Sequence, residues 1–340
     1  MKMVTIGNTK FPFDEELFAL NFENQPDLVK NAMVNSGAMV IDDYVASLIA
    51  NGGNYYTVPF YNTLADEEQD NYDGATNMSV SDASGAAQSG VVYGRMKAWR
   101  APQFAADITK ADPMGAIAAG IAPYYTKQRQ KRLVGITNAV LSLDDMKSHC
   151  VTKKALTENT LSDVTQEIWG DAKDNITLAV MHSSVAQVFE DLSRAQYLRY
   201  TDATGMTREV RTITVNGILC VIDDTVGKNT AAPSGRGGDN AAATYDTYLF
   251  GAGAIRYANA PVNNPVEVWR DAVKFGGIDF IGTRVRETIH PNGFTFKKPA
   301  NMTDSPTNAQ LFDKSNWQLA YKDPRAVFIG KVTTPAANAQ

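Results

Sequence analysis

Apolar residues recur every three or four positions between Asp107 and Leu143, the longest stretch of this kind in the chain. They form two stripes, which are Met114, Ile117, Ile121 and Tyr124, and then Leu133, Ile136, Val140 and Leu143. This spacing places each set on one face of an α-helix, and a helix from Pro113 to Leu143 would be roughly 46 Å long. The two stripes are out of phase. We therefore expect the helix to be buried at both ends, with a middle that faces solvent or another chain.

Local signals define the shape of this helix. Asp112 before Pro113 supplies an N-cap followed by a proline in the first turn, which favours a helix start. Pro123 lies inside the pattern and is expected to kink or divide the helix. The polar middle carries four cations, Lys127, Arg129, Lys131 and Arg132.

Residues 1–50 have the pattern of an arm made of short helices. The predicted helices are Asp14–Leu20, Pro26–Val34 and Ala38–Ala50. Helices this short are not stable alone, so the arm needs a surface to pack on.

Residues 51–100 predict a long two-stranded excursion. Tyr55–Tyr61 and Val91–Trp99 alternate as strands do, and the stretch between them is rich in Gly, Ser, Asp, Asn and Ala. Such a stretch is unusual inside a compact domain unless it has a function.

A stretch that includes most of this region has acidic but no basic residues. No Lys or Arg occurs from Asn31 to Gly94, whereas the acidic residues there are Asp42, Asp43, Asp66, Glu67, Glu68, Asp70, Asp73 and Asp82. One interpretation is a solvated acidic loop. The other is that Asp66, Glu67, Glu68, Asp70 and Asp73 pair across subunits with Lys127, Arg129, Lys131 and Arg132. Exposed pairs contribute only about 0 to 1 kcal/mol each and are screened by salt, so such assembly would depend on ionic strength.

Residues 144–265 predict an α/β unit. A helix follows the capping-like Thr160, and the strand Asn175–His182 leads into a helix that Ser183 or Ser184 would cap. Asn216-Gly217 between two apolar runs indicates a hairpin with a type I′ turn. The remaining expected features are a polar loop over Gly227–Thr244, a strand over Tyr245–Phe250, and a turn at Gly251–Gly253 followed by a short helix. From Val266 onward, the pattern predicts a small antiparallel sheet and a last strand over Arg325–Val332.

Composition narrows the class of protein. The chain has 340 residues, 44% of them hydrophobic, which is enough for a sizeable core. A net charge of −5 argues against a dedicated nucleic-acid binder. Cys150 and Cys220 are expected to be reduced, partly buried thiols. Because no run of 18 apolar residues and no signal-peptide core is present, we expect a soluble, unexported protein without a membrane partner.

Few residues suggest chemistry. His149, His182 and His290 lie far apart without ligands at metal-binding spacing, so no metal site is expected. His182 with Ser183 or Cys220 is the candidate for an α/β enzyme, but the glycines of a nucleophile elbow are missing. Gly251-Ala-Gly253 begins like a dinucleotide fingerprint, yet Arg256 occupies the place of the third glycine, so no cofactor is expected. The sequence therefore favours a protein that is not an enzyme.

The order of these parts resembles the major capsid proteins of tailed bacteriophages, whose shell fold encapsulins share. The segments that carry the resemblance are TVPFYNTL within Tyr56–Leu64, DPMGAI from Asp112, Asn175–Leu192 and Val215–Asp224. The resemblance runs from about Val40 to about Val332. It implies an α+β capsid fold with an N-terminal arm at 1–50, an extended loop hairpin at 51–100 and two domains. A peripheral domain with the long spine helix would comprise 101–145 and 266–319, and an α/β axial domain would comprise 146–265 and 320–340.

The resemblance also implies a function and partners. The chain would self-assemble through pentamers and hexamers into an icosahedral virion capsid around a phage genome, formed in the host bacterial cytoplasm. Separate scaffolding, portal and decoration proteins are implied partners, and packaged DNA would be contacted weakly and non-specifically. An encapsulin-like compartment is the alternative use of the same fold. Some shells of this family are cross-linked through a lysine of the extended loop, but no lysine occurs between Lys30 and Lys97. We therefore expect a non-covalent shell.

Overall fold

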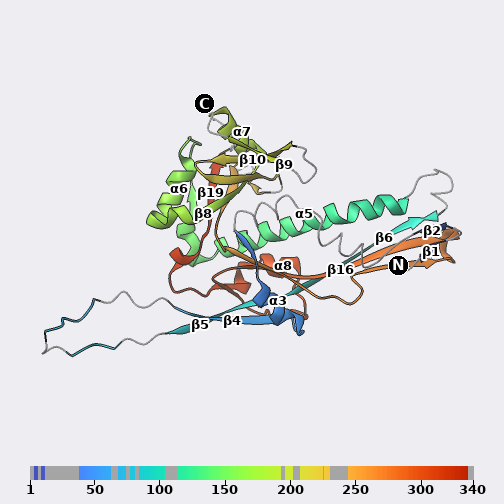
Figure 1. Cartoon of the computed structure of the whole chain (residues 1–340), viewed down its shortest axis with the longest axis horizontal. Coiled ribbons are helices and arrows are strands. Elements are labelled where there is room, and N and C mark those ends of the chain that lie inside the picture. The colour runs from blue at the N-terminus through green and yellow to red at the C-terminus, as the bar shows by residue number, and fades with distance from the viewer. Residues whose placement is uncertain are drawn as a thin grey trace, which may run out of the picture.

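The computed structural model of the chain (Figure 1) describes residues 4–6, 9–11, 38–62, 68–73, 77–80, 84–103, 113–192, 196–201, 207–224, 226–229 and 244–335. The expected helices Asp14–Leu20 and Pro26–Val34, the cap Asp112 and most of the polar loop after Gly227 lie outside these residues. Figure 1 shows an eight-stranded sheet with its helices above a long sheet and helix, and a narrow hairpin that projects to one side.

The eight-stranded sheet forms the α/β unit. Its strands are β7 (Cys150–Thr152), β8 (Ile176–Met181), β9 (Gln196–Thr201), β10 (Thr207–Val215), β11 (Ile218–Ile222), β12 (Lys228–Asn229), β13 (Thr244–Gly251) and β19 (Ile329–Pro335). The order is β7-β19-β13-β8-β11-β10-β9, with β12 beside β13. Helices α6 (Thr160–Trp169) and α7 (Ser183–Asp191) bury their apolar faces in one core with this sheet. The last strand thus returns to the sheet, as the resemblance led us to expect.

The predicted hairpin is present with the expected turn. Asn216 and Gly217 have φ values of 51° and 82°, the left-handed conformation that a type I′ turn requires at both central positions. The turn joins β10 to β11 in antiparallel register.

A second sheet of five strands is built around one long strand. Its members are β3 (Met39–Ile41), β6 (Tyr93–Pro102), β14 (Ile255–Ala260), β15 (Val266–Asp271) and β16 (Ile278–Pro291). Strand β16 pairs with β6 along one edge and with β15 and then β14 along the other. Two expectations were wrong here. The segment after Gly253 is strand β14 rather than a short helix, and the chain leaves the first sheet at Gly251 rather than at 265.

The predicted helix Ala38–Ala50 is also divided differently. Residues Met39–Ile41 pair with β14 as strand β3, and helix α3 (Asp43–Ala50) begins after Asp42. The Oδ1 of Asp42 accepts a hydrogen bond from the N–H of Val45 at 3.0 Å, so this side chain caps the helix and sets its start.

Helix α5 (Pro113–Leu141) is continuous over 29 residues, so Pro123 does not divide it. Its first half packs through Ile121 and Tyr125 on the β15–β16 region, and its second half packs through Ile136 and Val140 in the main core. Gly135 allows close approach, because a Cβ there would lie 2.3 Å from the Phe312 ring. The second end of α5 is thus buried against the same chain, but none of residues 114–120 is fully buried, so the expectation of burial was wrong for the first end.

The remaining elements are short, apart from the projecting hairpin of β4 (Tyr55–Tyr61) and β5 (Gly85–Val91). They are β1 (Val4–Ile6), β2 (Thr9–Phe11), β17 (Phe294–Phe296), β18 (Trp317–Leu319), α8 (Asn308–Phe312) and the 3₁₀ segments η1 (Asp144–His149), η2 (Gly170–Asn175), η3 (Lys274–Gly276), η4 (Lys314–Asn316) and η5 (Pro324–Ala326).

Candidate inter-subunit surfaces

The extended loop is anchored at its base. Along β4, Tyr56 and Val58 point inward and pack with α3 and β14, whereas Tyr55 and Thr57 point outward. The hydroxyl of Tyr56 lies 3.1 Å from Oγ1 of Thr288 in β16. Burial raises the pKa of Tyr56 to about 12, so this hydroxyl stays protonated and bonded. The alternation that the sequence shows at Tyr55–Tyr61 is therefore the pattern of a strand with one buried face.

The tip of the same loop has no such support within the chain. All described residues in 68–73 and 77–80 are exposed, and they include Tyr72 at 100%, Val80 at 89% and Met78 at 84%. The tip lies away from the rest of the molecule at the far end of the hairpin (Figure 1). An exposed cluster of large apolar side chains on a projecting loop indicates a contact surface for another chain.

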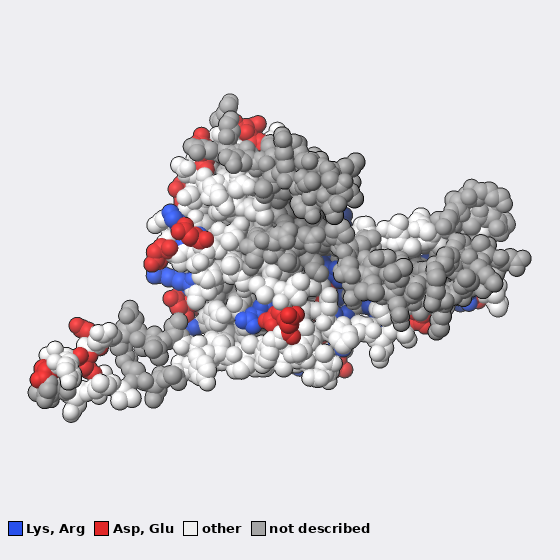
Figure 2. Space-filling model, in the orientation of Figure 1, with Lys and Arg blue, Asp and Glu red and all other residues white. Residues whose placement is uncertain are grey.

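The acidic side chains lie at this tip. Glu68, Asp70 and Asp73 are exposed there, and Figure 2 shows the red cluster at the end of the loop. Hydrogen bonds from the side chain and backbone of Ser79 lower the pKa of Asp70, so its charge is retained. Asp66 and Glu67 lie outside the described residues.

Two of the four predicted cations are used inside the chain. Arg129 and Arg132 both bind the carboxylate of Glu287 in β16, at 2.7 Å from Nε to Oε2 and 2.6 Å from Nη2 to Oε1. The side chain of Glu287 has no exposed surface, and Arg129 and Arg132 are buried. Our expectation that the whole middle of α5 faces solvent or a neighbour was therefore wrong for these two residues. The reason is that their helix face lies on the long sheet, where a buried guanidinium requires a carboxylate.

Burial and the two arginines have opposite effects on the pKa of Glu287. Burial alone would raise the pKa of Glu287, but the charges and hydrogen bonds of the two arginines outweigh burial and lower it. The same carboxylate raises the pKa of Arg129 and Arg132 against the effect of burial. The ring of Tyr93 lies under Arg132, with the guanidinium carbon 5.3 Å from the centroid. The cluster fixes α5 on β16 with all three groups charged.

Lys127 and Lys131 differ from their neighbours, because both side chains are exposed. They are the two predicted basic partners that remain accessible to another subunit.

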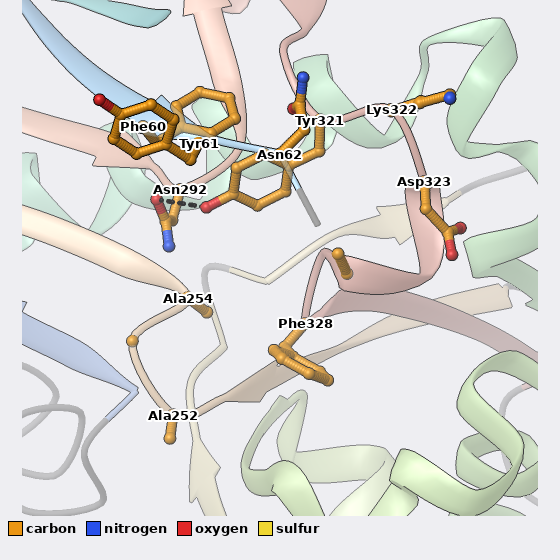
Figure 3. A pocket seen from close by; sticks show the side chains of 12 residues that line it. Phe60, Tyr61, Asn62, Ala252, Ala254, Asn292, Tyr321, Lys322, Asp323 and Phe328 are labelled. Carbon is orange, nitrogen blue, oxygen red and sulfur yellow. Dashed lines mark hydrogen bonds between the residues drawn. The ribbon is translucent and has the colours of Figure 1, made fainter. Parts of the chain in front are cut away.

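A pocket lies at the root of the extended loop, where β4 ends (Figure 3). Its volume is about 390 Å³, at the small end of the range of ligand pockets. Phe60 and Tyr321 meet edge to face on one side, with ring centroids 5.1 Å apart, and Phe328 lies on another. Asn292 contributes its amide, and Lys322 and Asp323 also line the pocket.

The enzyme candidate does not form a catalytic arrangement. His182, rather than Ser183 or Ser184, is the N-cap of α7, and its Nδ1 accepts a hydrogen bond from the N–H of Ser184 at 3.1 Å. Cys220 lies opposite Ala179 in the sheet, three residues and about 10 Å along the strand from His182. Burial raises the pKa of Cys220 to about 12, so the nucleophilic thiolate is suppressed.

The other candidate chemistry is equally absent from the parts described. His149 and His290 are separately buried, and burial lowers the pKa of each. No cluster of three or more potential metal ligands occurs among the described residues. None of the helices in the described ranges is both long and apolar enough to cross a membrane.

Sequence reasoning missed two residues. Glu287 is an acidic residue within an alternating strand, and the signal for it was that Arg129 and Arg132, three positions apart, share a helix face. Asn292 lies in the sequence Pro291-Asn292-Gly293, which is typical of a turn. Its side chain also joins the loop base to β14, because its Oδ1 accepts from Gln88 and Arg256.

Comparison with known proteins shows that most of the chain is similar to phage capsid proteins. No family model matches the chain. It is 28% identical over 309 residues to the major capsid protein of Bacillus phage SPP1, covering 88% of this chain and 89% of that protein.

Solved structures with the same fold come from other phages. The cyanophage Pam1 capsid subunit matches with a TM-score of 0.53 at 11% identity, covering 84% of this chain and 86% of that one. The capsid of Ralstonia phage GP4 matches with a TM-score of 0.52 at 8% identity and 85% coverage of both chains. The capsid of Helicobacter pylori bacteriophage KHP30 matches with a TM-score of 0.51 at 10% identity, covering 88% of both. This chain is therefore similar over nearly its full length to a phage major capsid protein, and it has the α+β shell fold of phage capsid subunits.

Proposed function

We propose that this chain is the structural subunit of a phage capsid, assembling through pentamers and hexamers into an icosahedral shell around the genome. The observation that carries the proposal is the extended loop, which has a buried base and a fully exposed apolar tip. A chain that keeps Tyr72, Met78 and Val80 exposed gains by burying them against a neighbour. The full-length similarity to a major capsid protein supports the same function.

Assembly requires that each subunit present complementary surfaces. The loop tip is one, and its exposed acidic side chains favour a basic surface on the next subunit. The long sheet also has exposed apolar side chains, which are Met96 in the middle of β6 and Val273 after β15, and near its far end Trp269 stacks on Phe280 with centroids 5.2 Å apart. Weak contacts of this kind become strong when a closed, symmetric shell repeats them. All these contacts are non-covalent.

The subunit is a virion component in this proposal, assembled in the host cytoplasm with separate scaffolding, portal and decoration proteins. Its role is structural rather than enzymatic. Packaged DNA would meet the shell weakly and without sequence specificity, in line with the net charge of −5.

The test is the solution assembly of the purified chain. Light scattering and electron microscopy should detect pentamers, hexamers, sheets or closed particles. A strictly monomeric mass at high protein concentration would contradict the proposal. Co-expression with candidate scaffolding and portal genes separates the uses of the fold, because particles that package DNA identify a capsid and particles that select a protein cargo identify a compartment.

A further inference from the structure

The pocket at the root of the extended loop has the chemistry of a receptor for an aromatic side chain. Its apolar surface comes from Phe60, Tyr321 and Phe328, which approach from two separate segments of the chain (Figure 3). Aromatic rings prefer edge-to-face and offset contacts, and the three rings that line this pocket can make both kinds of contact with an inserted ring. The volume of about 390 Å³ suits one large side chain with part of its backbone rather than a peptide segment.

One polar donor faces the same space. The Oδ1 of Asn292 accepts from three donors, which are Nε2 of Gln88 at 3.1 Å, Nε of Arg256 at 3.2 Å and the hydroxyl of Tyr321 at 3.2 Å. These bonds determine which way the amide is turned. Its Nδ2 makes no hydrogen bond within the described part of the chain, and in Figure 3 it points away from Tyr321 toward the open side near Ala254. A hydroxyl on the inserted ring would accept from this nitrogen.

The charges near the opening favour an acidic partner. Lys322 and Arg325 are exposed, and neither forms an ion pair with another described residue. Asp323 is the one acidic residue beside them, and its Oδ1 is already bonded to the N–H of Arg325 at 2.9 Å. The pocket therefore fits an aromatic side chain that carries a hydroxyl and is flanked by carboxylates.

The tip of the extended loop contains such a side chain. Tyr72 is fully exposed, and Glu68, Asp70 and Asp73 flank it without any nearby cation in the sequence. Because Tyr72 is fully exposed in its own chain, its own pocket does not hold it. We propose that Tyr72 at the loop tip of one subunit inserts into the root pocket of a second copy, with its hydroxyl on Asn292 and the flanking acids beside Lys322 and Arg325.

This contact rests on the proposed shell function and gives it a defined geometry. Each subunit has one tip and one root, so the contact is heterologous and each subunit both donates and receives a loop. The tip of one loop would then brace the base of the next, where Tyr56 and Gln88 hold the hairpin to the body.

Cross-linking in assembled particles tests the contact. In the full chain with Cys150→Ser and Cys220→Ser, Asn71→Cys is combined with Lys322→Cys and treated with a short bismaleimide. We expect a ladder of covalent oligomers on a denaturing gel, reduced several-fold by adding Tyr72→Ala and much less by Tyr72→Phe, which keeps the ring. The matched control pairs Asn71→Cys with Lys131→Cys. A ladder from the Lys131 pair and none from the Lys322 pair would overturn the proposal and show instead that the loop tip binds on α5 of the neighbouring subunit.

A second variant addresses the pocket without altering the tip. Ala326 is exposed and lines the pocket, so Ala326→Trp should fill it while leaving the melting temperature unchanged. We expect particle yield to fall at least tenfold, whereas Ala155→Trp, at an exposed position that does not line the pocket, should assemble normally. Normal assembly of Ala326→Trp would overturn the pocket contact and leave the shell function intact. Failure of the unsubstituted chain to assemble would instead overturn the proposed function.

Discussion

The basic middle of α5 and the acidic tip of the extended loop carry opposite charges, yet the fold treats them differently. Arg129 and Arg132 are buried and bound to Glu287 of the same chain. Glu68, Asp70 and Asp73 remain exposed with the apolar residues of the tip. A buried charge must be paired inside the fold, because its desolvation costs several kcal/mol, whereas an exposed charge is stabilised by water until a partner arrives. The comparison separates charge that holds the subunit together from charge available for assembly.

The largest expected effect comes from removing the buried carboxylate. Glu287→Gln leaves two buried guanidiniums without their counter-charge, so we expect a loss of about 3–5 kcal/mol in the free energy of unfolding. Guanidinium titration of the unassembled subunit, followed by tryptophan fluorescence, measures it. The matched control is Glu267→Gln, because Glu267 pairs with Arg284 at 2.7 Å but is about half exposed and should cost about 0–1 kcal/mol. Equal losses of unfolding free energy in the two variants would contradict the distinction between buried and exposed ion pairs.

The next effect concerns acid stability at the loop base. His290 packs between the rings of Tyr56 and Trp317, and burial, together with the charge of Arg256, lowers its pKa from 6.5 to about 4. The unfolded chain therefore binds more protons between these values, and stability falls as the pH drops from 6.5 toward 4, by roughly 3 kcal/mol. The loss is complete below the lower value and absent at pH 7.

Unfolding titrations at several pH values check this. In the His290→Gln variant, the free energy of unfolding should depend less on pH between 6.5 and 4. The stability of this variant at neutral pH measures the effect of the lost packing separately. Below the window, Glu287 adds to the acid sensitivity, because its lowered pKa stabilises the fold only while it is ionised. An unchanged slope in His290→Gln would assign the acid sensitivity to other groups.

Polar substitution of the tip should separate folding from assembly. The triple variant Tyr72→Ser, Met78→Ser and Val80→Ser removes only exposed apolar surface, so subunit unfolding should change by about 0.5 kcal/mol or less. Particle formation should be lost. Val58→Ala at the buried base of the same hairpin is the contrasting variant and should lower subunit stability instead. A tip variant that assembles normally would remove the loop from the contacts that hold the shell.

The smallest effect is expected for the exposed cations of α5. Lys127→Glu with Lys131→Glu should leave subunit stability within about 0.5 kcal/mol, because both side chains are exposed. If they pair with the acidic tip, the substitutions place like charges opposite each other, so particle yield should fall and added salt should partly restore it. If particle yield and its salt dependence match those of the unsubstituted chain, the tip does not bind these lysines. That result is the one expected if the tip binds the root pocket.

Much of the fold follows from local patterns. Helical spacing predicted α5, Asn216-Gly217 predicted a hairpin with its turn type, and alternation predicted β4. The short strands β3 and β14 were missed, because Met39–Ile41 and Ile255–Ala260 are too short for a reliable period and become strands by pairing. Of the candidate site, the acidic tip was evident from composition. The pocket was not, because Phe60, Asn292 and Phe328 come from three distant segments.

The sequence by itself determined the long helix, the Asn216-Gly217 hairpin, the absence of lysine from the loop and the placement of Arg129 and Arg132 on one helix face. These follow from spacing and composition, which act over a few residues. Only the tertiary structure decided that those arginines bind Glu287, 158 and 155 residues away, and that the tip is exposed while the base is buried. The physical reason is desolvation, since the partner of a charge depends on which groups leave water together, and the fold of the whole chain sets that.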